Sequence, residues 1–282
     1  MDPLSVQHIE KGKNQLIMVV LLSISTFLLA IYALGQGSSS NLDMWTTAKI
    51  LFGIDDPSDL QSDIIWKLRF PRILIAVIGG VALATAGSLM QGCLANPLVS
   101  PLTLGVASGA ALGAALAIVL GITIVDVPNL GIVVNAFLFS LIVVYIIIQL
   151  GNLRSISSES YILVGIAITF ITGAIVSTMQ YFATDAQLSQ LTHWSFGSLS
   201  RPELIDVLWI GVVVIGLMPQ AIRWSWDLNA LTLGGDDFAI STGVDPSVIR
   251  RNILVLSALM TSVVIAFTGL IGFVGLAAPH MA

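Results

Sequence analysis

Three clusters of polar or charged residues interrupt an otherwise apolar chain, and each could bind a partner or line a passage. In the first cluster, Lys67, Arg69 and Arg72 crowd the start of one apolar run. Anchoring a helix end at a membrane interface needs only one or two cations. The cluster therefore indicates either a lipid-headgroup anchor or a docking patch for an acidic partner.

The second cluster follows the same apolar run, where two prolines four residues apart prevent a continuous helix. Gln91 and Asn96 supply polar groups there, and Pro97, Leu98 and Pro101 complete the break. Proline lacks a backbone donor and moves the preceding residue out of the helical region. Non-helical backbone at membrane depth is tolerated only where protein buries it or water reaches it. The break is either a plain loop or a constriction in a transport path.

The third cluster lies in a long polar connector and has the signals of a short helix. Gly234 and Gly235 predict a turn, Asp236 is a favourable N-cap, and Asp237 suits the positive end of a helix dipole. These signals predict a helix of about two turns over residues 237–242.

The end of that connector predicts the start of another helix. Gly243 can take the left-handed position that ends a helix, Asp245 is a second N-cap, and Pro246 suits the first helical position. Phe238 and Ile240 are among the few apolar side chains in the connector. The segment is either a well-folded loop or a surface presented to a partner.

The residue types needed for catalysis or metal binding lack suitable spacing. Cys93 is the only cysteine, and the three histidines, His8, His193 and His280, lie far apart. The one Gly-Lys pair, Gly12-Lys13, is followed by Asn14, so the phosphate loop of ATPases is missing. We expect neither an enzyme nor a cofactor or metal site, and any use of ATP would need a partner.

Composition places these clusters in a membrane protein. Charged residues make up only 10% of the 282 residues, and the mean hydropathy is +0.96. A net charge of -5 without a basic run argues against nucleic acid as a partner.

Continuous apolar runs of span length predict an all-α, polytopic transmembrane helix bundle in one domain, residues 1–282. Polar connectors separate the runs, with a short amphipathic helix expected near 45–52 and loops at 151–158 and 183–203. With the N-terminus in the cytoplasm, six cations lie inside and five outside, so the positive-inside bias is slight. The predicted spans are 15–34, 72–92, 103–125, 130–150, 160–182, 204–222 and 252–270, with a shorter eighth at 271–281.

Small residues four apart form two helical faces that would let another backbone approach closely. One face carries Gly80, Ala84 and Ser88, and the other carries Gly105, Gly109 and Gly113. They indicate tight helix packing or room for a passage at a subunit interface.

Taken in order, these motifs resemble the permease subunits of ATP-binding-cassette (ABC) importers for iron siderophores, haem and cobalamin, the FecCD type. The resemblance extends from about residue 16 to 282. The first motif, R-x-P-R followed by a helix ending near Gln and N-P-L-x-x-P-x-x-L-G-x-x-x-G-A, is matched by Arg69, Pro71, Arg72, Gln91, Asn96, Pro97, Leu98, Pro101, Leu104, Gly105, Gly109 and Ala110. The second, L-x-x-L-x-L-G with a later T-G turn, is matched by Leu228, Leu231, Leu233, Gly234, Thr242 and Gly243. The third, G-x-I-x-F-x-G-L-x-x-P-H, is matched by Gly269, Ile271, Phe273, Gly275, Leu276, Pro279 and His280.

The resemblance implies a homodimeric or heterodimeric permease in the bacterial cytoplasmic (inner) membrane, with its N-terminus in the cytoplasm. Its partners would be a second permease subunit, two cytoplasmic ATP-binding subunits, an external substrate-binding protein and membrane lipid. The cargo would be a metal chelate, with ferric siderophore favoured as the commonest substrate of the family.

The resemblance also implies roles for single residues. Arg69 and Arg72 would dock the binding protein. The gate and translocation path would include Gln91, Asn96, Pro97, Leu98, Ile156, Ser157 and Ser158. The ATPase would contact Gly234, Asp236, Asp237, Ala239 and Gly243.

Two departures from the family pattern are visible. In the family about two more helices follow the P-H motif, so about eight of ten expected spans are present here. Gly235 stands where an acidic or other polar residue is common, which would weaken one contact with the ATPase. A secondary transporter driven by an ion gradient is the alternative reading, but such transporters place ionisable groups at mid-membrane, and the spans here carry almost none.

Overall fold

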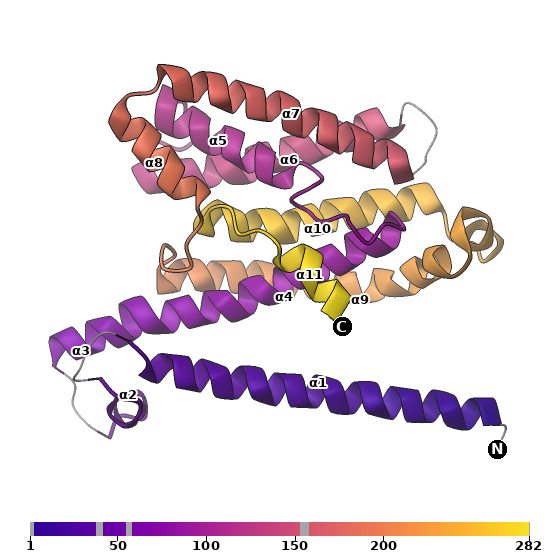
Figure 1. Ribbon diagram of the computed structural model, residues 1–282, viewed down its shortest axis with the longest axis horizontal. Helices are drawn as coiled ribbons and strands as arrows, with labels where there is room; N and C mark the ends of the chain where they lie inside the picture. The colour runs from indigo at the N-terminus through magenta and orange to yellow at the C-terminus, as the bar shows by residue number, and fades with distance from the viewer. Residues whose placement is uncertain (1–2, 38–41, 55–57, 153–157, 282) are drawn as a thin grey trace. The chain divides into compact units, whose positions relative to one another are not determined.

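The structure, a computed structural model, describes residues 3–37, 42–54, 58–152 and 158–281. Regular structure within these ranges is entirely helical, which confirms the predicted all-α fold (Figure 1). The chain forms two compact units, Met1–Ile73 and Leu74–Ala282. Six of the described helices are long and apolar enough to cross a membrane.

The first unit contains the first apolar helix and the connector that follows it. Helix α2 confirms the amphipathic helix expected near 45–52. Asp43 caps it by accepting a hydrogen bond of 2.8 Å from the Thr46 backbone N–H. A small core of Leu42, Ile50 and Ile65 lies beneath α2. The elements are α1 (Pro3–Gly35), α2 (Met44–Leu51), α3 (Asp59–Asp63), the π-helix η1 (Ile64–Arg69) and the start of α4 (Phe70–Cys93).

The second unit packs its helices around α10, which lies between α5 and α6 on one side and α4 and α9 on the other (Figure 1). Of the most apolar window of α10, 72% is buried inside the protein, more than for the other span-length helices described. The elements after α4 are α5 (Val106–Leu120), α6 (Pro128–Asn152), α7 (Ser158–Phe182), α8 (Asp185–Ser195), α9 (Leu204–Ser241), α10 (Pro246–Thr268) and α11 (Val274–Met281).

Four predicted boundaries were wrong. The span expected at 204–222 continues as helix α9 (Leu204–Ser241) through the expected polar connector, because no glycine or proline interrupts residues 220–233. In the other three a local signal was missed. The span expected at 103–125 is the shorter helix α5, which left-handed glycines bound on both sides, Gly105 with φ 88° and Gly121 with φ 66°. The eighth run begins as helix only at Val274, after the left-handed Phe273. The expected loop at 183–203 contains α8, whose capping box joins Thr184 and Gln187.

The glycine face of α5 packs against a neighbouring helix, which is one of the two uses that its spacing indicated. A Cβ placed at Gly109 would lie 2.7 Å from the Phe139 carbonyl oxygen, and one at Gly113 would overlap the Asn135 backbone. By contrast, a Cβ at Gly80 on α4 would meet nothing within 4 Å in the described chain. Of the α4 glycines, Gly87 is the most crowded, because the backbone of Gly275 in α11 lies against it. The α5 face therefore packs against another helix at Gly109 and Gly113, whereas the α4 face leaves space at Gly80.

This difference predicts opposite outcomes for two matched substitutions. Gly113→Ala forces α5 and α6 apart and should destabilise the fold by about 1–3 kcal/mol, the usual cost of overpacking. Gly80→Ala should be neutral or stabilising, because alanine is the better helix former and has room. Thermal unfolding of the purified chain in detergent checks both, and equal melting temperatures would contradict the prediction.

Candidate functional site

The junction between α9 and α10, residues Gly235–Asp245 and here called the junction segment, begins with a break in the helix. Gly235 has φ 72° and ψ -164°, a backbone conformation available essentially to glycine alone. This confirms the predicted turn but corrects the predicted cap. Asp236 follows the break within the helix, and its carboxylate is bound by Arg250 instead of serving as the N-cap.

The end of the junction segment matches its predicted capping. The Val244 N–H donates to the Ala239 carbonyl and the Gly243 N–H to the Ile240 carbonyl, with φ 86° at Gly243. This is a Schellman motif, which needs a left-handed residue at the position of Gly243.

Asp245 then caps α10, with Pro246 as its first residue. Hydrogen bonds from the Ser247 hydroxyl, then from the Val248 and Ser247 backbone N–H groups, lower the pKa of Asp245. Because the pKa is lowered in the folded state, the cap stabilises α10 fully at pH values above the ordinary pKa of aspartate. That contribution is lost as the pH falls through the lowered pKa.

The junction segment has an inner and an outer face. Ala239 is fully buried, whereas Asp237 is exposed. The exposed fractions of Phe238 and Ile240 are 44% and 62%, and that of Leu233, just before the segment, is 79%. Apolar side chains on an exposed, capped segment form a patch suited to a protein partner.

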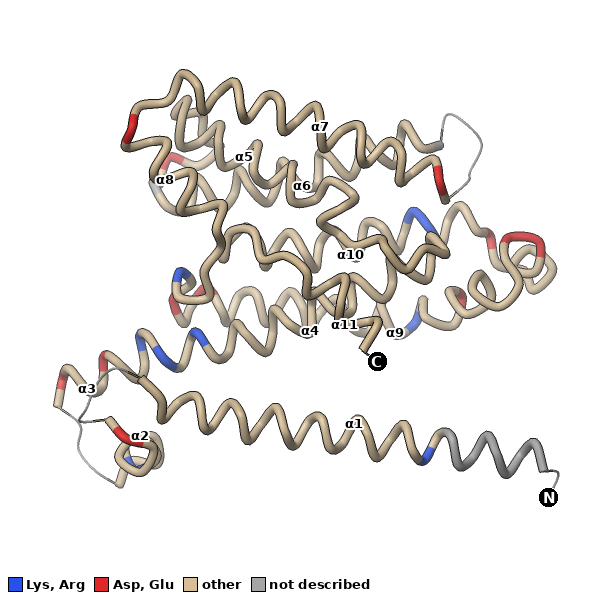
Figure 2. The backbone as a smooth tube through the Cα atoms, viewed as in Figure 1, with Lys and Arg blue, Asp and Glu red and all other residues tan. Residues whose placement is uncertain are grey.

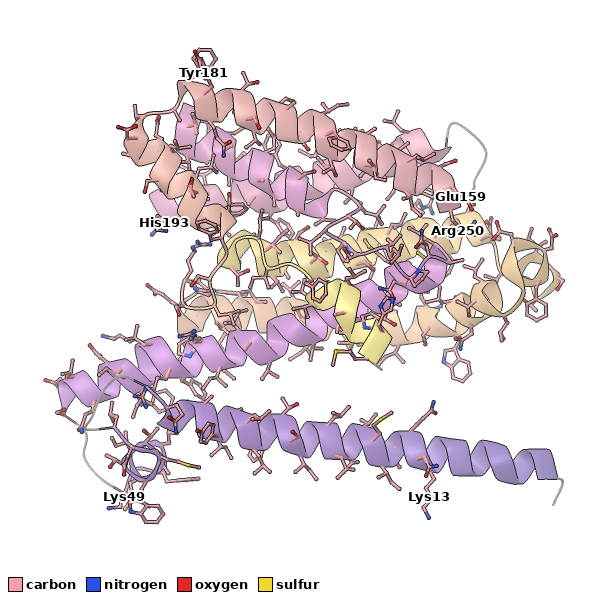
Figure 3. All side chains as sticks on the ribbon, in the orientation of Figure 1. Lys13, Lys49, Glu159, Tyr181, His193 and Arg250 are labelled. Carbon is pink, nitrogen blue, oxygen red and sulfur yellow. The ribbon has the colours of Figure 1, made fainter. Side chains whose placement is uncertain are left out.

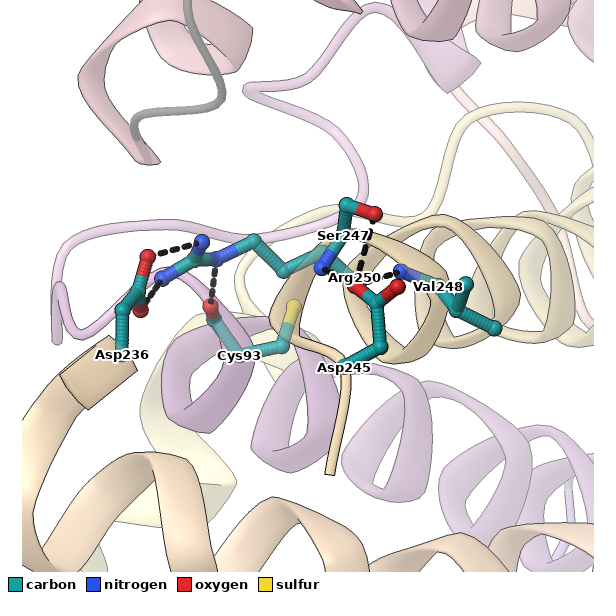
Figure 4. Close-up of polar contacts among 6 residues, drawn as sticks. All are labelled: Cys93, Asp236, Asp245, Ser247, Val248 and Arg250. Carbon is teal, nitrogen blue, oxygen red and sulfur yellow. Dashed lines mark hydrogen bonds and ion pairs between the residues drawn. The ribbon is translucent and has the colours of Figure 1, made fainter. Parts of the chain in front are cut away.

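A buried arginine ties the inner face to two other helices (Figure 4). The Arg250 side chain is 7% exposed. Its Nη1 donates to Asp236 Oδ2 at 2.8 Å, its Nη2 donates to Asp236 Oδ1, and its Nε donates to the Cys93 carbonyl at 3.1 Å. Sequence reasoning missed Arg250. Its signal was a cation near the N-terminus of a helix, which the helix dipole disfavours unless an acid compensates.

The turn after α4 is held by its own polar side chains. Asn96 Oδ1 accepts a hydrogen bond of 2.9 Å from the Leu98 N–H, and Ala95 adopts a left-handed φ of 48°. Leu98 is 71% exposed, and Pro97 is also exposed. Gln91 lies in the last turn of α4 and donates to the Leu276 carbonyl of α11 at 3.2 Å.

The other expected gate residues are described only in part. Ser158 is buried at the start of α7. Ile156 and Ser157 lie outside the described residues.

The two arginines of the first unit differ in their surroundings. Arg69 Nη1 donates to the carbonyls of Leu34, at 2.8 Å, and Leu42, at 3.4 Å. Its guanidinium thereby binds the C-terminal end of α1, where free carbonyls favour a cation. Gly37 lies directly against this group. Arg72, one turn further along, is exposed.

Most charged residues in the second unit lie near helix ends and in the connectors, with Arg223 and Asp227 inside α9 as exceptions (Figure 2). His193 and Arg250 mark opposite ends of that unit (Figure 3). Within the described ranges, no group of three or more His, Cys, Asp or Glu could hold a metal ion.

Comparison with known proteins decides the family. The model of the FecCD transport family matches residues 21–282. The chain belongs to the FecCD transport family. Among its relatives, a Methanocaldococcus jannaschii protein described as an ABC transporter permease is 37% identical, over 95% of this chain and 78% of that protein. The hemin transport system permease protein HmuU of Yersinia pestis is 34% identical, over 93% of this chain and 78% of that protein.

Two relatives of lower sequence identity support the same family. The vitamin B12 import system permease protein BtuC of Vibrio cholerae is 30% identical, over 79% of this chain and 66% of that protein. A solved inward-facing ABC transporter, described as of metal-chelate type, superimposes with a TM-score of 0.79 at 28% identity, over 94% of this chain and 80% of that one. This FecCD member is therefore a polytopic membrane permease of the ABC importer type.

Proposed function

We propose that this chain is the permease subunit of a binding-protein-dependent ABC importer that carries a metal chelate, with a ferric siderophore as the expected cargo. The relatives named for hemin and vitamin B12 and the metal-chelate type structure support a chelate as the substrate class. We infer a dimer of permeases, two cytoplasmic ATP-binding subunits and an external binding protein as the assembly.

The junction segment is the observation that carries this proposal. It is capped at its end and exposes Asp237, Phe238 and Ile240. We assign this outer face to the groove of an ATP-binding subunit. A partner that hydrolyses ATP would then bind the junction segment and move it. The N-terminus of the chain and the junction segment would both lie on the cytoplasmic side.

The turn at Asn96, Pro97 and Leu98 would be the inner gate. Helix α4 has 24 residues and is therefore about 36 Å long, enough to cross the hydrocarbon core. The turn after Cys93 and the exposed Arg72 near the start of α4 would then face opposite sides of the membrane. We assign the Arg72 side to docking of the external binding protein.

Reconstitution tests the function directly. The chain is co-purified with its ATP-binding subunit, placed in proteoliposomes with the binding protein, and supplied with the ligand that the binding protein retains. ATP-dependent uptake of a metal chelate is the expected result, and mass spectrometry identifies the chelate. Uptake driven by an ion gradient without the ATPase would overturn the proposal.

A further inference from the structure

Arg250 is the one described side chain that bonds both the junction segment and the end of α4. Its guanidinium holds Asp236, the first residue after the Gly235 break, through two hydrogen bonds, one to each carboxylate oxygen. Its Nε holds the main-chain carbonyl of Cys93, the last residue of α4. Figure 4 shows both contacts on the same planar group.

The two contacts differ from ordinary packing because they are directional. A bidentate pair between arginine and a carboxylate fixes orientation as well as distance. The group is also poorly solvated, since the Arg250 side chain is 7% exposed, so a broken bond is not readily replaced by water. A displacement of Asp236 should therefore either move Arg250 or leave the buried guanidinium without its Asp236 contact, since water reaches Asp236 but hardly reaches Arg250.

The Cys93 carbonyl that Arg250 binds is close in sequence to the Asn96–Leu98 turn. Only Leu94 and Ala95 separate Cys93 from Asn96. Leu94 is 2% exposed, and Ala95 is held in the left-handed region at φ 48°. A constrained link of two residues leaves little slack between the carbonyl that Arg250 binds and the Asn96–Leu98 turn.

We propose that Arg250 is a positioning residue that transmits movement of the junction segment to the Asn96–Leu98 turn. The role rests on the proposed function, in which the ATP-binding subunit moves the junction segment. The Asp236 side chain is 41% exposed, but its carboxylate is engaged by Arg250. The surface that meets the ATPase is then left mainly to Asp237, Phe238 and Ile240. A static brace would make the same bonds but would not carry a displacement from one end to the other.

The test measures how readily a thiol reagent reaches the Asn96–Leu98 turn. Cys93→Ala removes the only cysteine while keeping the carbonyl that Arg250 binds, and Leu98→Cys then places one thiol at an exposed position. Ala239→Val pushes the junction segment outward, since Ala239 is fully buried. The labelling rate of the thiol by a water-soluble maleimide is measured for Ala239→Val, for Arg250→Gln and for both together, in the purified chain.

We expect Ala239→Val to change the labelling rate about fivefold with Arg250 present and less than about twofold with Arg250→Gln, a coupling typical of residues in one network. Arg251→Gln, an exposed neighbour, is the matched control and should leave the fivefold change intact. Equal changes with and without Arg250 would overturn the proposal. Circular dichroism and melting temperature check that each variant is folded. If Arg250→Gln does not fold, Arg250→Lys, which keeps the charge but loses the planar fork of donors, replaces it.

A second arm separates this proposal from the proposed function. The same thiol is followed in the complex with the ATP-binding subunit, with and without ATP. A response to ATP that disappears with Arg250→Gln while the subunits stay bound supports both proposals. If the unmodified chain binds no ATPase, the proposed function fails. The comparison of Ala239→Val, Arg250→Gln and the double variant in the purified chain still decides the role of Arg250.

Discussion

Replacing Phe238 by glutamate should detach the ATP-binding subunit from the permease while leaving the permease folded. Phe238 is 44% exposed on the outer face of the junction segment, and a buried aromatic anchor at an interface is worth about 2 kcal/mol or more, or roughly thirtyfold in Kd. Glutamate would also bring a charge into an apolar contact beside Asp237. Co-purification of the two subunits, and the Kd by interferometry, measure the loss.

Phe196→Glu provides the matched control for this experiment. Phe196 follows α8 and is 78% exposed, but it lies at the end of the second unit that our assignment places outside the cytoplasm. Its replacement should leave the affinity for the ATPase unchanged. If Phe196→Glu weakened binding as much as Phe238→Glu, or if neither did, the junction segment would not be the ATPase contact.

Reversing the charge at Arg72 should weaken docking of the external binding protein at least about tenfold, because like charges facing each other at an interface cost several kcal/mol. Arg72 is exposed, so the folded state should tolerate glutamate. The affinity should also become less sensitive to salt, since a rim charge acts through screened attraction. Surface plasmon resonance at two salt concentrations measures both effects.

Arg69→Glu should instead damage the fold. Hydrogen bonds from a charged group are worth about 1.5–3 kcal/mol, and Arg69 donates them to the carbonyls of Leu34 and Leu42. A carboxylate there would repel the carbonyl end of α1. We expect a lower melting temperature for Arg69→Glu and an unchanged one for Arg72→Glu. Weakened docking with a normal melting temperature for Arg69→Glu would show that this arginine also meets the partner.

Much of the fold followed from signals that act over a few residues. Apolar runs of span length required helices because lipid cannot satisfy a bare backbone. Gly243, Asp245 and Pro246 marked the end of one helix and the start of the next, as the structure has them. A cap or a left-handed turn involves groups within about five positions, so its meaning can be read from the sequence alone.

The sequence did not show which of two residues in the same pattern makes a tertiary contact. Gly80 and Gly113 have the same spacing pattern, yet only Gly113 is in contact with a neighbouring backbone. Arg69 and Arg72 belong to one motif, yet only Arg69 turns to the end of α1. Helical spacing states which residues share a face, but not which faces find partners.

The sequence by itself determined a membrane helix bundle, a break after Cys93, and a capped segment before Pro246. Only the tertiary structure decided that Asp236 turns inward to Arg250, 14 residues away, and that Arg250 reaches the Cys93 carbonyl, 157 residues away in the chain. The physical reason is that a cap is chosen by its immediate neighbours, whereas a buried guanidinium binds whichever acceptors the packing of distant helices brings within reach.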